Sequence, residues 1–162
     1  MSFDADNEVP GRFTVCDAGD ATVIVDSCRN LSSLDALIET LQSFPSKRRV
    51  FVGIEGASRR DVDLERMGAR IGAAFDRIVL FGMIDSPEPS TGSLRNSLRR
   101  GLLSGDRGTE IVEIPDREMA IEAAISGLEA GDLALVQVDT TFPLSTVERV
   151  RACARLRAGR VA

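Results

Sequence analysis

Two loops in the sequence hold the residue types that could do chemistry. The first runs from Asp26 to Asn30 and follows the β-branched run at residues 22–25. Asp26 could bind a ribose hydroxyl or orient a cation, or it could cap the helix that follows or the loop before it. Asn30 has the same two interpretations. Arg29 adds a cation that could meet a phosphate or carboxylate, or could simply be solvated.

The second loop spans residues 55–63 and follows another apolar run. Its glycine permits a close backbone approach, and Arg59 and Arg60 place positive charge just before an expected helix. That combination suits anion binding, although an ordinary solvated connection has the same composition. Asp61 or Asp63 is expected to cap the helix that starts here.

Several kinds of chemistry are excluded by what the sequence lacks. There is no histidine, which removes Ser–His and Cys–His catalysis and every histidine-based metal motif. Cys16, Cys28 and Cys153 form no CxxC pair, so we expect reduced thiols, with no disulfide and no metal site. Cys28 could be a nucleophile, but no histidine is available to activate it. No GxxxxGKS or GxxxxGKT phosphate loop occurs.

Composition indicates one ordinary domain. The chain has 162 residues, of which 43% are hydrophobic and 28% charged. A net charge of −5 argues against nucleic acid or an anionic membrane as the main partner. No apolar run approaches the roughly 20 residues of a membrane span, and the start is acidic rather than signal-like. We therefore expect a cytoplasmic protein.

The elements that must position the two loops alternate along the chain. Strands are expected at residues 12–16, 21–26, 50–54, 77–81, 110–114 and 133–138, with helices at about 33–41, 61–75, 93–103, 118–128 and 143–156. This alternation predicts an α/β protein with a mainly parallel sheet of about six strands and helices on both faces. Residues 17–20 are expected to turn an N-terminal hairpin.

The order of several short motifs resembles a known family. Residues 10–13 read PGRF and residues 23–31 read VIVDSCRNL. They resemble the start of the C-terminal domain of the Mur ligase superfamily, where PGR precedes a strand ending in D-Y-x-H-N-P. Residues 59–63, 74–80 and 122–139 are similar to the cyanophycin synthetases in particular. By this resemblance residues 1–9 correspond to a linker, 10–157 to the domain and 158–162 to a tail.

The resemblance implies a function as well as a Rossmann-like, three-layer fold. In the family this domain is a lid that closes on a separate ATPase domain, and the enzyme joins amino acids through an acyl-phosphate made from ATP. ATP and magnesium are thus the implied cofactors, and the ATPase domain or the polymer product is the implied partner. Arg12 and Asp26 would contact the nucleotide, and Asn30 keeps the motif's asparagine. Arg59, Arg60 and Asp61 would face the cleft between the domains.

Departures from the family pattern leave three functional hypotheses open. Ser27, Arg29 and Leu31 replace the tyrosine, histidine and proline of the motif. Residues 83–89 also lack the arginine that related ligases use for the incoming amino acid. The chain could be a ligase lid that is not catalytic alone, a stand-alone non-catalytic binding or regulatory module, or a small enzyme using Cys28 or acidic residues. An exposed strand edge or apolar helix face would also favour a homodimer.

Overall fold

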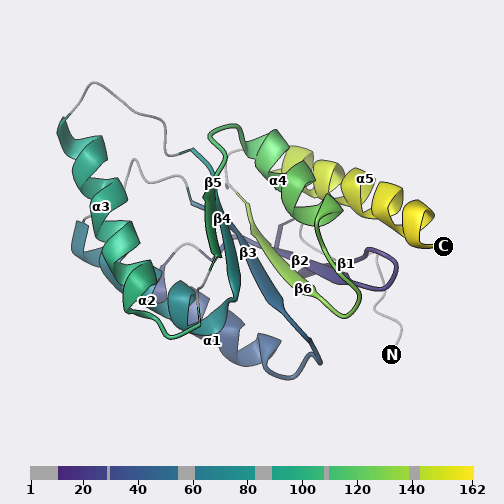
Figure 1. Cartoon of the computed structure of the whole chain (residues 1–162), viewed down its shortest axis with the longest axis horizontal. Coiled ribbons are helices and arrows are strands. Elements are labelled where there is room, and N and C mark those ends of the chain that lie inside the picture. The colour runs from purple at the N-terminus through teal and green to yellow at the C-terminus, as the bar shows by residue number, and fades with distance from the viewer. Residues whose placement is uncertain (1–10, 29, 55–60, 83–88, 108–109, 139–142) are drawn as a thin grey trace.

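Six strands form a single sheet in the order β1–β2–β6–β3–β4–β5 (Figure 1). This computed structural model describes residues 11–28, 30–54, 61–82, 89–107, 110–138 and 143–162. β1 pairs with β2 in antiparallel fashion, and the other neighbours are parallel. The mainly parallel sheet and the N-terminal hairpin are therefore confirmed. The strands are β1 Thr14–Asp17, β2 Thr22–Asp26, β3 Arg49–Gly53, β4 Arg77–Leu80, β5 Glu110–Glu113 and β6 Leu133–Gln137.

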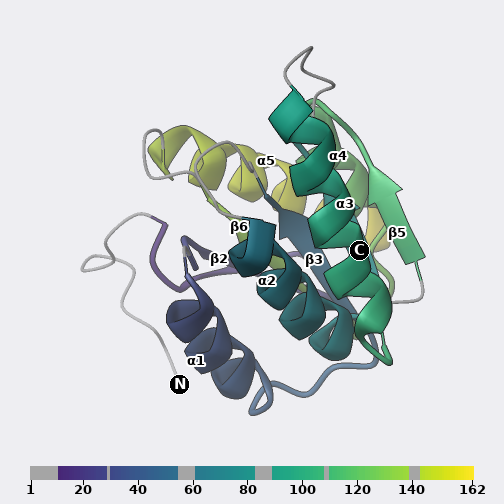
Figure 2. The same ribbon diagram turned by 90° about the vertical axis from the view of Figure 1, so that its left-hand side faces the viewer.

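Helices cover both faces of this sheet, as the alternating pattern predicts. They are α1 Leu31–Leu41, α2 Asp61–Ala74, α3 Pro89–Ser104, α4 Arg117–Ser126 and α5 Pro143–Val161. The first three lie on one face, and α4 and α5 lie on the other (Figures 1 and 2). The result is a three-layer α/β structure. Within the described residues, no helix has the combination of length and apolar character needed to cross a bilayer.

Alternate residues of each strand supply two separate cores. In β2, Val23 and Val25 pack toward α4 and α5, whereas Ile24 packs toward α1 and α2. This follows from the two-residue period of a strand, which sends successive side chains to opposite faces. Both faces of the sheet are thus buried, which explains the near-continuous apolar runs of its central strands.

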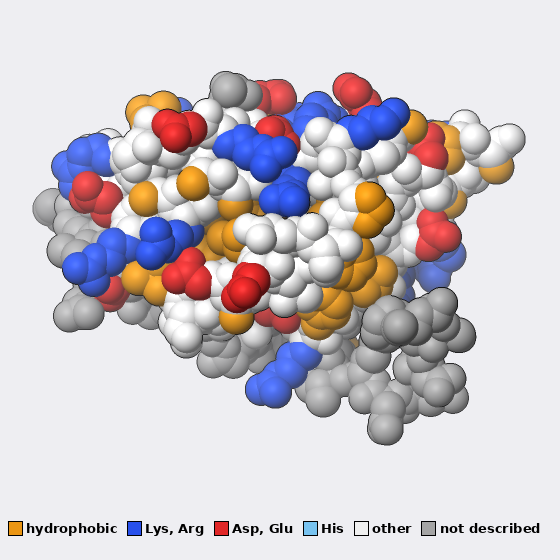
Figure 3. Space-filling view, turned by 90° about the horizontal axis from the view of Figure 1, so that it is seen from below, with side chains coloured by type: hydrophobic (Ala, Val, Ile, Leu, Met, Phe, Trp, Pro, Cys, Tyr) orange, Lys and Arg blue, Asp and Glu red, His pale blue; other side chains and the backbone are white. Residues whose placement is uncertain are grey.

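The surface near α1 carries partly buried hydrophobic side chains. Phe13 and Val15 lie beside the β1 edge of the sheet, and Ile38 and Phe44 lie on or just after α1; all four pack against the core of this layer. A space-filling view from this side shows hydrophobic side chains gathered in one area among charged ones (Figure 3). The rings of Phe13 and Phe44 are 6.0 Å apart and tilted. This aromatic contact connects the segment before β1 to the helical layer.

Several element boundaries differ from those that the sequence predicts, among them the starts of α3 and β1 and the end of α5. α3 begins at Pro89 rather than at residue 93; proline suits the first turn because its missing N–H would have no helical partner there. α5 continues to Val161, beyond the expected end near residue 156. β1 begins at Thr14 rather than at residue 12, because Gly11 and Phe13 have positive φ values of 81° and 40°. Extended pairing is impossible in that conformation.

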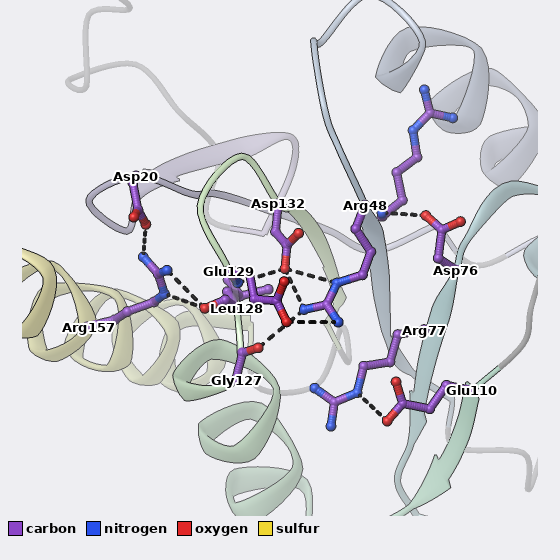
Figure 4. A network of polar contacts seen from close by, with 11 residues as sticks. Asp20, Arg48, Asp76, Arg77, Glu110, Gly127, Leu128, Glu129, Asp132 and Arg157 are labelled. Atoms are coloured by element: carbon purple, nitrogen blue, oxygen red, sulfur yellow. Dashed lines mark hydrogen bonds and ion pairs between the residues drawn. The ribbon is translucent and has the colours of Figure 1, made fainter.

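Ion pairs close the amino end of the parallel strands (Figure 4). The Arg48 guanidinium lies 2.6 Å from the Asp132 carboxylate, and this hydrogen bond raises the pKa of Arg48. Arg77 pairs with Glu110 at 3.2 Å. β2 and β3 lead into the loops expected to do chemistry at the opposite, carboxyl end of the sheet.

Candidate functional site

The Asp26 side chain organises the carboxyl end of β2. One of its carboxylate oxygens, Oδ2, accepts a hydrogen bond from the Phe13 amide, and the other, Oδ1, accepts one from the Cys28 amide, both at 2.9 Å. Its carbonyl oxygen accepts a bond from the Val138 amide at 3.0 Å. Asp26 therefore connects the segment before β1, the loop after β2 and the end of β6. Its structural role is to hold these three backbone segments together.

Arg12 is presented by the segment that Asp26 holds. It lies between Gly11 and Phe13, whose positive φ values turn the chain sharply. The Phe13 amide is fixed by Asp26, and the Phe13 ring contacts Phe44. The Arg12 side chain itself is exposed. A permanently charged guanidinium is thus displayed to solvent beside the carboxyl end of β2.

Asn30 begins α1 as its N-cap. Its side chain accepts a hydrogen bond from the Ser33 amide at 2.9 Å, and the Ser33 hydroxyl accepts one from the Asn30 amide at 3.2 Å. This reciprocal arrangement is a capping box, which satisfies two backbone donors at the helix start. Of the two interpretations of Asn30, capping is the one that the structure shows. Leu31, the next residue, packs against the core on the α1 side.

Gln137, which was not predicted as a site residue, connects the loop after β2 to the residue that precedes the second loop. Its side chain is 5% exposed. The amide oxygen accepts a 2.8 Å hydrogen bond from the Ile54 backbone, and the amide nitrogen donates a 3.3 Å bond to the Cys28 carbonyl. One buried side chain thus fixes the loop after β2 relative to the first residue beyond β3. A sequence signal existed, because a glutamine at the end of an apolar strand must find partners when buried.

The backbone where Gln137 binds is strained. Ile54 has a φ of 79°, a conformation that β-branched residues rarely adopt. Gly53 leaves the space for Gln137, because a Cβ at this position would lie 2.6 Å from the Gln137 amide oxygen. Such strain costs about 1–3 kcal/mol and persists only where neighbouring contacts enforce it. Gln137 supplies one of those contacts at the entrance to the arginine-containing loop.

Replacing Gln137 with leucine is expected to lower the free energy of unfolding by about 2–3 kcal/mol. The substitution keeps a similar volume but leaves the Ile54 amide and the Cys28 carbonyl buried without this partner. Faster hydrogen exchange at the Ile54 amide should accompany the loss. Gln42→Leu is the matched control, because Gln42 is exposed at the end of α1 and should change stability by less than about 0.5 kcal/mol.

The remaining candidates of the two loops lie wholly or partly outside the described residues. Arg29, Arg59 and Arg60 lie outside the described residues, so their arrangement is not part of the structural site. Asp61 is the first residue of α2, and its side chain is also outside the described part. What the structure connects is therefore Asp26, which binds the amide next to Arg12, and Gln137, which shares Cys28 with Asp26, whereas Asn30 caps α1. Among the described residues, no group of three or more potential metal ligands occurs.

The cysteines are buried rather than presented at this edge. Cys28 is 1% exposed, and none of the three is in a disulfide. Burial raises the pKa of the Cys153 thiol, and Glu122 and Glu118 raise it further against the opposing effect of Arg149. A buried thiol is a poor nucleophile. The hypothesis of a small enzyme built on Cys28 therefore has no geometric support.

Sequence comparison relates the chain to ligases that are much longer than it is. The profile of the family described as "Mur ligase, glutamate ligase domain" matches residues 11–137. A UDP-N-acetylmuramoyl-L-alanyl-D-glutamate–2,6-diaminopimelate ligase of Geobacillus thermodenitrificans is 33% identical over 79% of this chain and 26% of its own length. A cyanophycin synthetase of Crocosphaera subtropica is 28% identical over 89% of this chain and 16% of its own length. The chain thus spans about a quarter or less of these relatives.

Solved structures show the same fold. A diaminopimelate ligase superposes with a TM-score of 0.69 at 20% identity, over 92% of this chain and 32% of its own. The MurF ligase of Thermotoga maritima, solved in complex with ADP, superposes with a TM-score of 0.61 at 21% identity, over 98% and 33%. At these identities the superpositions support the three-layer fold itself.

Proposed function

The chain belongs to the Mur ligase, glutamate ligase domain family, and from this premise we propose that it is the C-terminal lid of an ATP-dependent amino-acid ligase. In this role it is not catalytic alone. It closes on an ATPase domain that carries the phosphate loop, since residues 1–162 contain no such motif. The similarity to a cyanophycin synthetase over 89% of the chain favours a polymer-forming ligase of that kind.

The observation that carries the proposal is the presentation of Arg12. A sharply turned backbone, fixed by Asp26 and by the Phe13–Phe44 contact, displays an exposed guanidinium at the carboxyl end of the sheet. Ligands of open α/β sheets bind at this end. A guanidinium is also the side chain best suited to phosphate oxygens, because it offers two parallel N–H donors.

Asp26 and Gln137 act as positioning residues in this proposal. Asp26 uses both carboxylate oxygens to hold the Phe13 and Cys28 amides, and so it orients Arg12 from the neighbouring strand. Gln137 fixes the entrance of the loop that contains Arg59 and Arg60. When bound, ATP would supply the phosphoryl group that activates a carboxylate. Arg12, together with the cations of that loop, would hold the phosphates from the lid side.

A second candidate is a stand-alone, non-catalytic module that binds a partner ligase or its polymer product. One observation favours it. In the loop where the family has D-Y-x-H-N-P, Asn30 is engaged in a capping box and Leu31 packs against the core. These positions stabilise the start of α1 without any ligand. A domain that does not bind nucleotide would keep these stabilising contacts and could still associate with a partner.

Calorimetry with magnesium and ATP tests the first candidate against the second. The full chain is titrated into the ATPase domain of a cyanophycin synthetase, with and without the nucleotide. We expect association that requires nucleotide, and Arg12→Met should weaken it at least tenfold through loss of charge-assisted hydrogen bonds. Arg155→Met, which removes an exposed arginine from α5, is the control and should bind like the native chain.

The other outcomes are equally decisive. Association of the same strength without nucleotide, unaffected by Arg12→Met, would overturn the lid function and support the stand-alone module. No association under either condition would overturn the lid function and would also exclude this ligase as the partner of the stand-alone module. Circular dichroism of each variant establishes that a loss of binding does not come from unfolding.

A further inference from the structure

β1 is an edge strand, and within the described residues it pairs with β2 alone. The Ala18 amide bonds to the Ala21 carbonyl, and Cys16 pairs with Val23 two residues farther along the same ladder. Hydrogen-bonded pairs alternate with non-bonded pairs in an antiparallel ladder. Cys16 therefore bonds to β2, whereas Val15 presents its N–H and C=O groups to the free side of the strand.

The β1 edge lacks the features that usually keep an exposed strand from pairing with another chain. Charged side chains, prolines and bulges are the common protection. The opposite edge strand, β5, has a glutamate at each end, and these glutamates pair with Arg77 and Arg95. β1 reads Thr-Val-Cys-Asp, so Asp17 is its one charged residue. Of the two edges of the sheet, β1 is therefore the one suited to pairing.

An apolar patch adjoins this edge on the α1 side of the sheet. It consists of Phe13, Val15, Ile38 and Phe44, which pack against the core of the α1 layer but are not fully buried. Figure 3 shows hydrophobic side chains gathered on this side of the molecule. The strand edge offers directional hydrogen bonds, and the patch offers apolar area. These are the two components of a protein interface.

A second copy of this chain fits the β1 edge because the edge is self-complementary. A twofold axis perpendicular to the sheet at Val15 places the Val15 residues of two copies opposite each other, where each amide donates to the other's carbonyl. The same rotation keeps both α1 layers on one side of the joined sheet, so the two apolar patches adjoin. We propose that the chain forms a homodimer in which the β1 strands pair antiparallel about Val15.

Sedimentation equilibrium of the full chain, at about 5–200 µM, tests the proposal. We expect a dimer whose fraction rises with concentration. Val15→Lys sets two like charges opposite each other and should raise the dissociation constant about tenfold or more, and Val15→Glu should do the same. An equimolar mixture of the two variants should dimerise again, because opposite charges then meet across the axis. Val112→Lys makes the same change at a half-buried valine of β5 and should dimerise like the native chain.

Hydrogen exchange of the native chain gives a second measurement, which decides the question even if the Val15 variants fail to fold. Exchange of the Val15 amide should slow as the protein concentration rises, because this amide is bonded only in the dimer. The Cys16 amide bonds to β2 in the monomer and should be protected at every concentration. Equal exchange of the Val15 amide at low and high concentration would overturn the proposal.

Three results of the sedimentation experiment would also overturn it. The native chain could stay monomeric throughout, as it would if residues 1–10 or another protein covered the patch. A dimer could persist in Val15→Lys, which would place the interface elsewhere. Folded Val15→Lys and Val15→Glu could fail to dimerise when mixed, which would exclude pairing about Val15. No nucleotide or ATPase domain is present in these assays, so each of these results would leave the lid function untouched.

Discussion

Replacing Gly101 with alanine is expected to lower the free energy of unfolding by about 3 kcal/mol. Gly101 lies in α3, where a Cβ would stand 2.0 Å from the Glu65 carbonyl oxygen and 2.9 Å from the Ala69 amide nitrogen, both in α2. Both atoms belong to helix backbone, so the clash can be relieved only if the helices move apart. Urea denaturation followed by circular dichroism measures the loss.

Glycines on both α2 and α3 lie against the backbone of the other helix, which is why the expected loss of unfolding free energy is large. A Cβ on Gly72 of α2 would lie 2.2 Å from the Leu102 carbonyl oxygen in α3. Separating the helices would also loosen Leu98 and Leu102 from the core that they share with Ile71. The methyl group gains about 1 kcal/mol in helix propensity, but lost packing along the interface outweighs that gain.

Gly159→Ala is the matched control for Gly101→Ala. Gly159 lies in α5, and a Cβ there would meet nothing within 4 Å. The same substitution should therefore raise the free energy of unfolding by about 0.5–1 kcal/mol, because alanine loses less conformational entropy than glycine on folding. If the two variants shifted the unfolding midpoint in the same direction, the backbone contact between α2 and α3 would not be the cause.

The architecture was predictable because its signals are local. The β-branched run at residues 22–25 and the apolar run at residues 133–136 identify two of the strands, and helical spacing of leucines identifies α1. Asn30 was a recognisable cap candidate for the same reason, since its partner Ser33 is only three residues away. The start of α3 at Pro89 was missed. A proline can mark either a loop or the first turn of a helix, and here the preceding residues favoured a loop.

The site was predictable only where its contacts are local. Asp26 was recognisable by its place at the end of a strand, and one of its side chain's two partners, Cys28, is nearby. The other, Phe13, comes from a segment whose positive φ values the sequence does not indicate. Gln137 reaches Ile54 across 83 positions and Cys28 across 109. Such pairings depend on strand order, in which β6 lies between β2 and β3, and no local pattern specifies that order.

Arg157→Met is expected to lower the free energy of unfolding by about 3–5 kcal/mol. The Arg157 side chain, in α5, is 6% exposed. It donates a hydrogen bond to the Leu128 carbonyl oxygen at 2.9 Å and pairs with Asp20 at 2.6 Å (Figure 4). It also donates one to the Ala18 carbonyl oxygen. One guanidinium thus joins α5 to the β1–β2 turn and to the end of α4. Methionine fills a similar volume but leaves both carbonyls without this donor.

Comparison with Arg155→Met shows how much of the stability lost in Arg157→Met comes from the burial of Arg157 and not from the removal of a charge. Arg155 is exposed on the same helix, so its replacement removes the same charge and should change stability by less than about 0.5 kcal/mol. Thermal unfolding of both variants, followed by circular dichroism, gives the difference. A loss of similar size in the two variants would mean that the carbonyl contacts of Arg157 contribute nothing measurable.

Asp20→Asn separates the charge of this contact from its hydrogen bonds. The Asp20 side chain is 44% exposed, so water and salt screen its attraction to Arg157, and the ion pair should contribute no more than about 1 kcal/mol. The buried carbonyls of Ala18 and Leu128 have no such solvent to replace the guanidinium. We therefore expect Asp20→Asn to cost far less than Arg157→Met, with a difference that does not shrink at high salt. If both substitutions cost the same, the stabilisation would come from the charge pair, and the carbonyls would have to be satisfied by water instead.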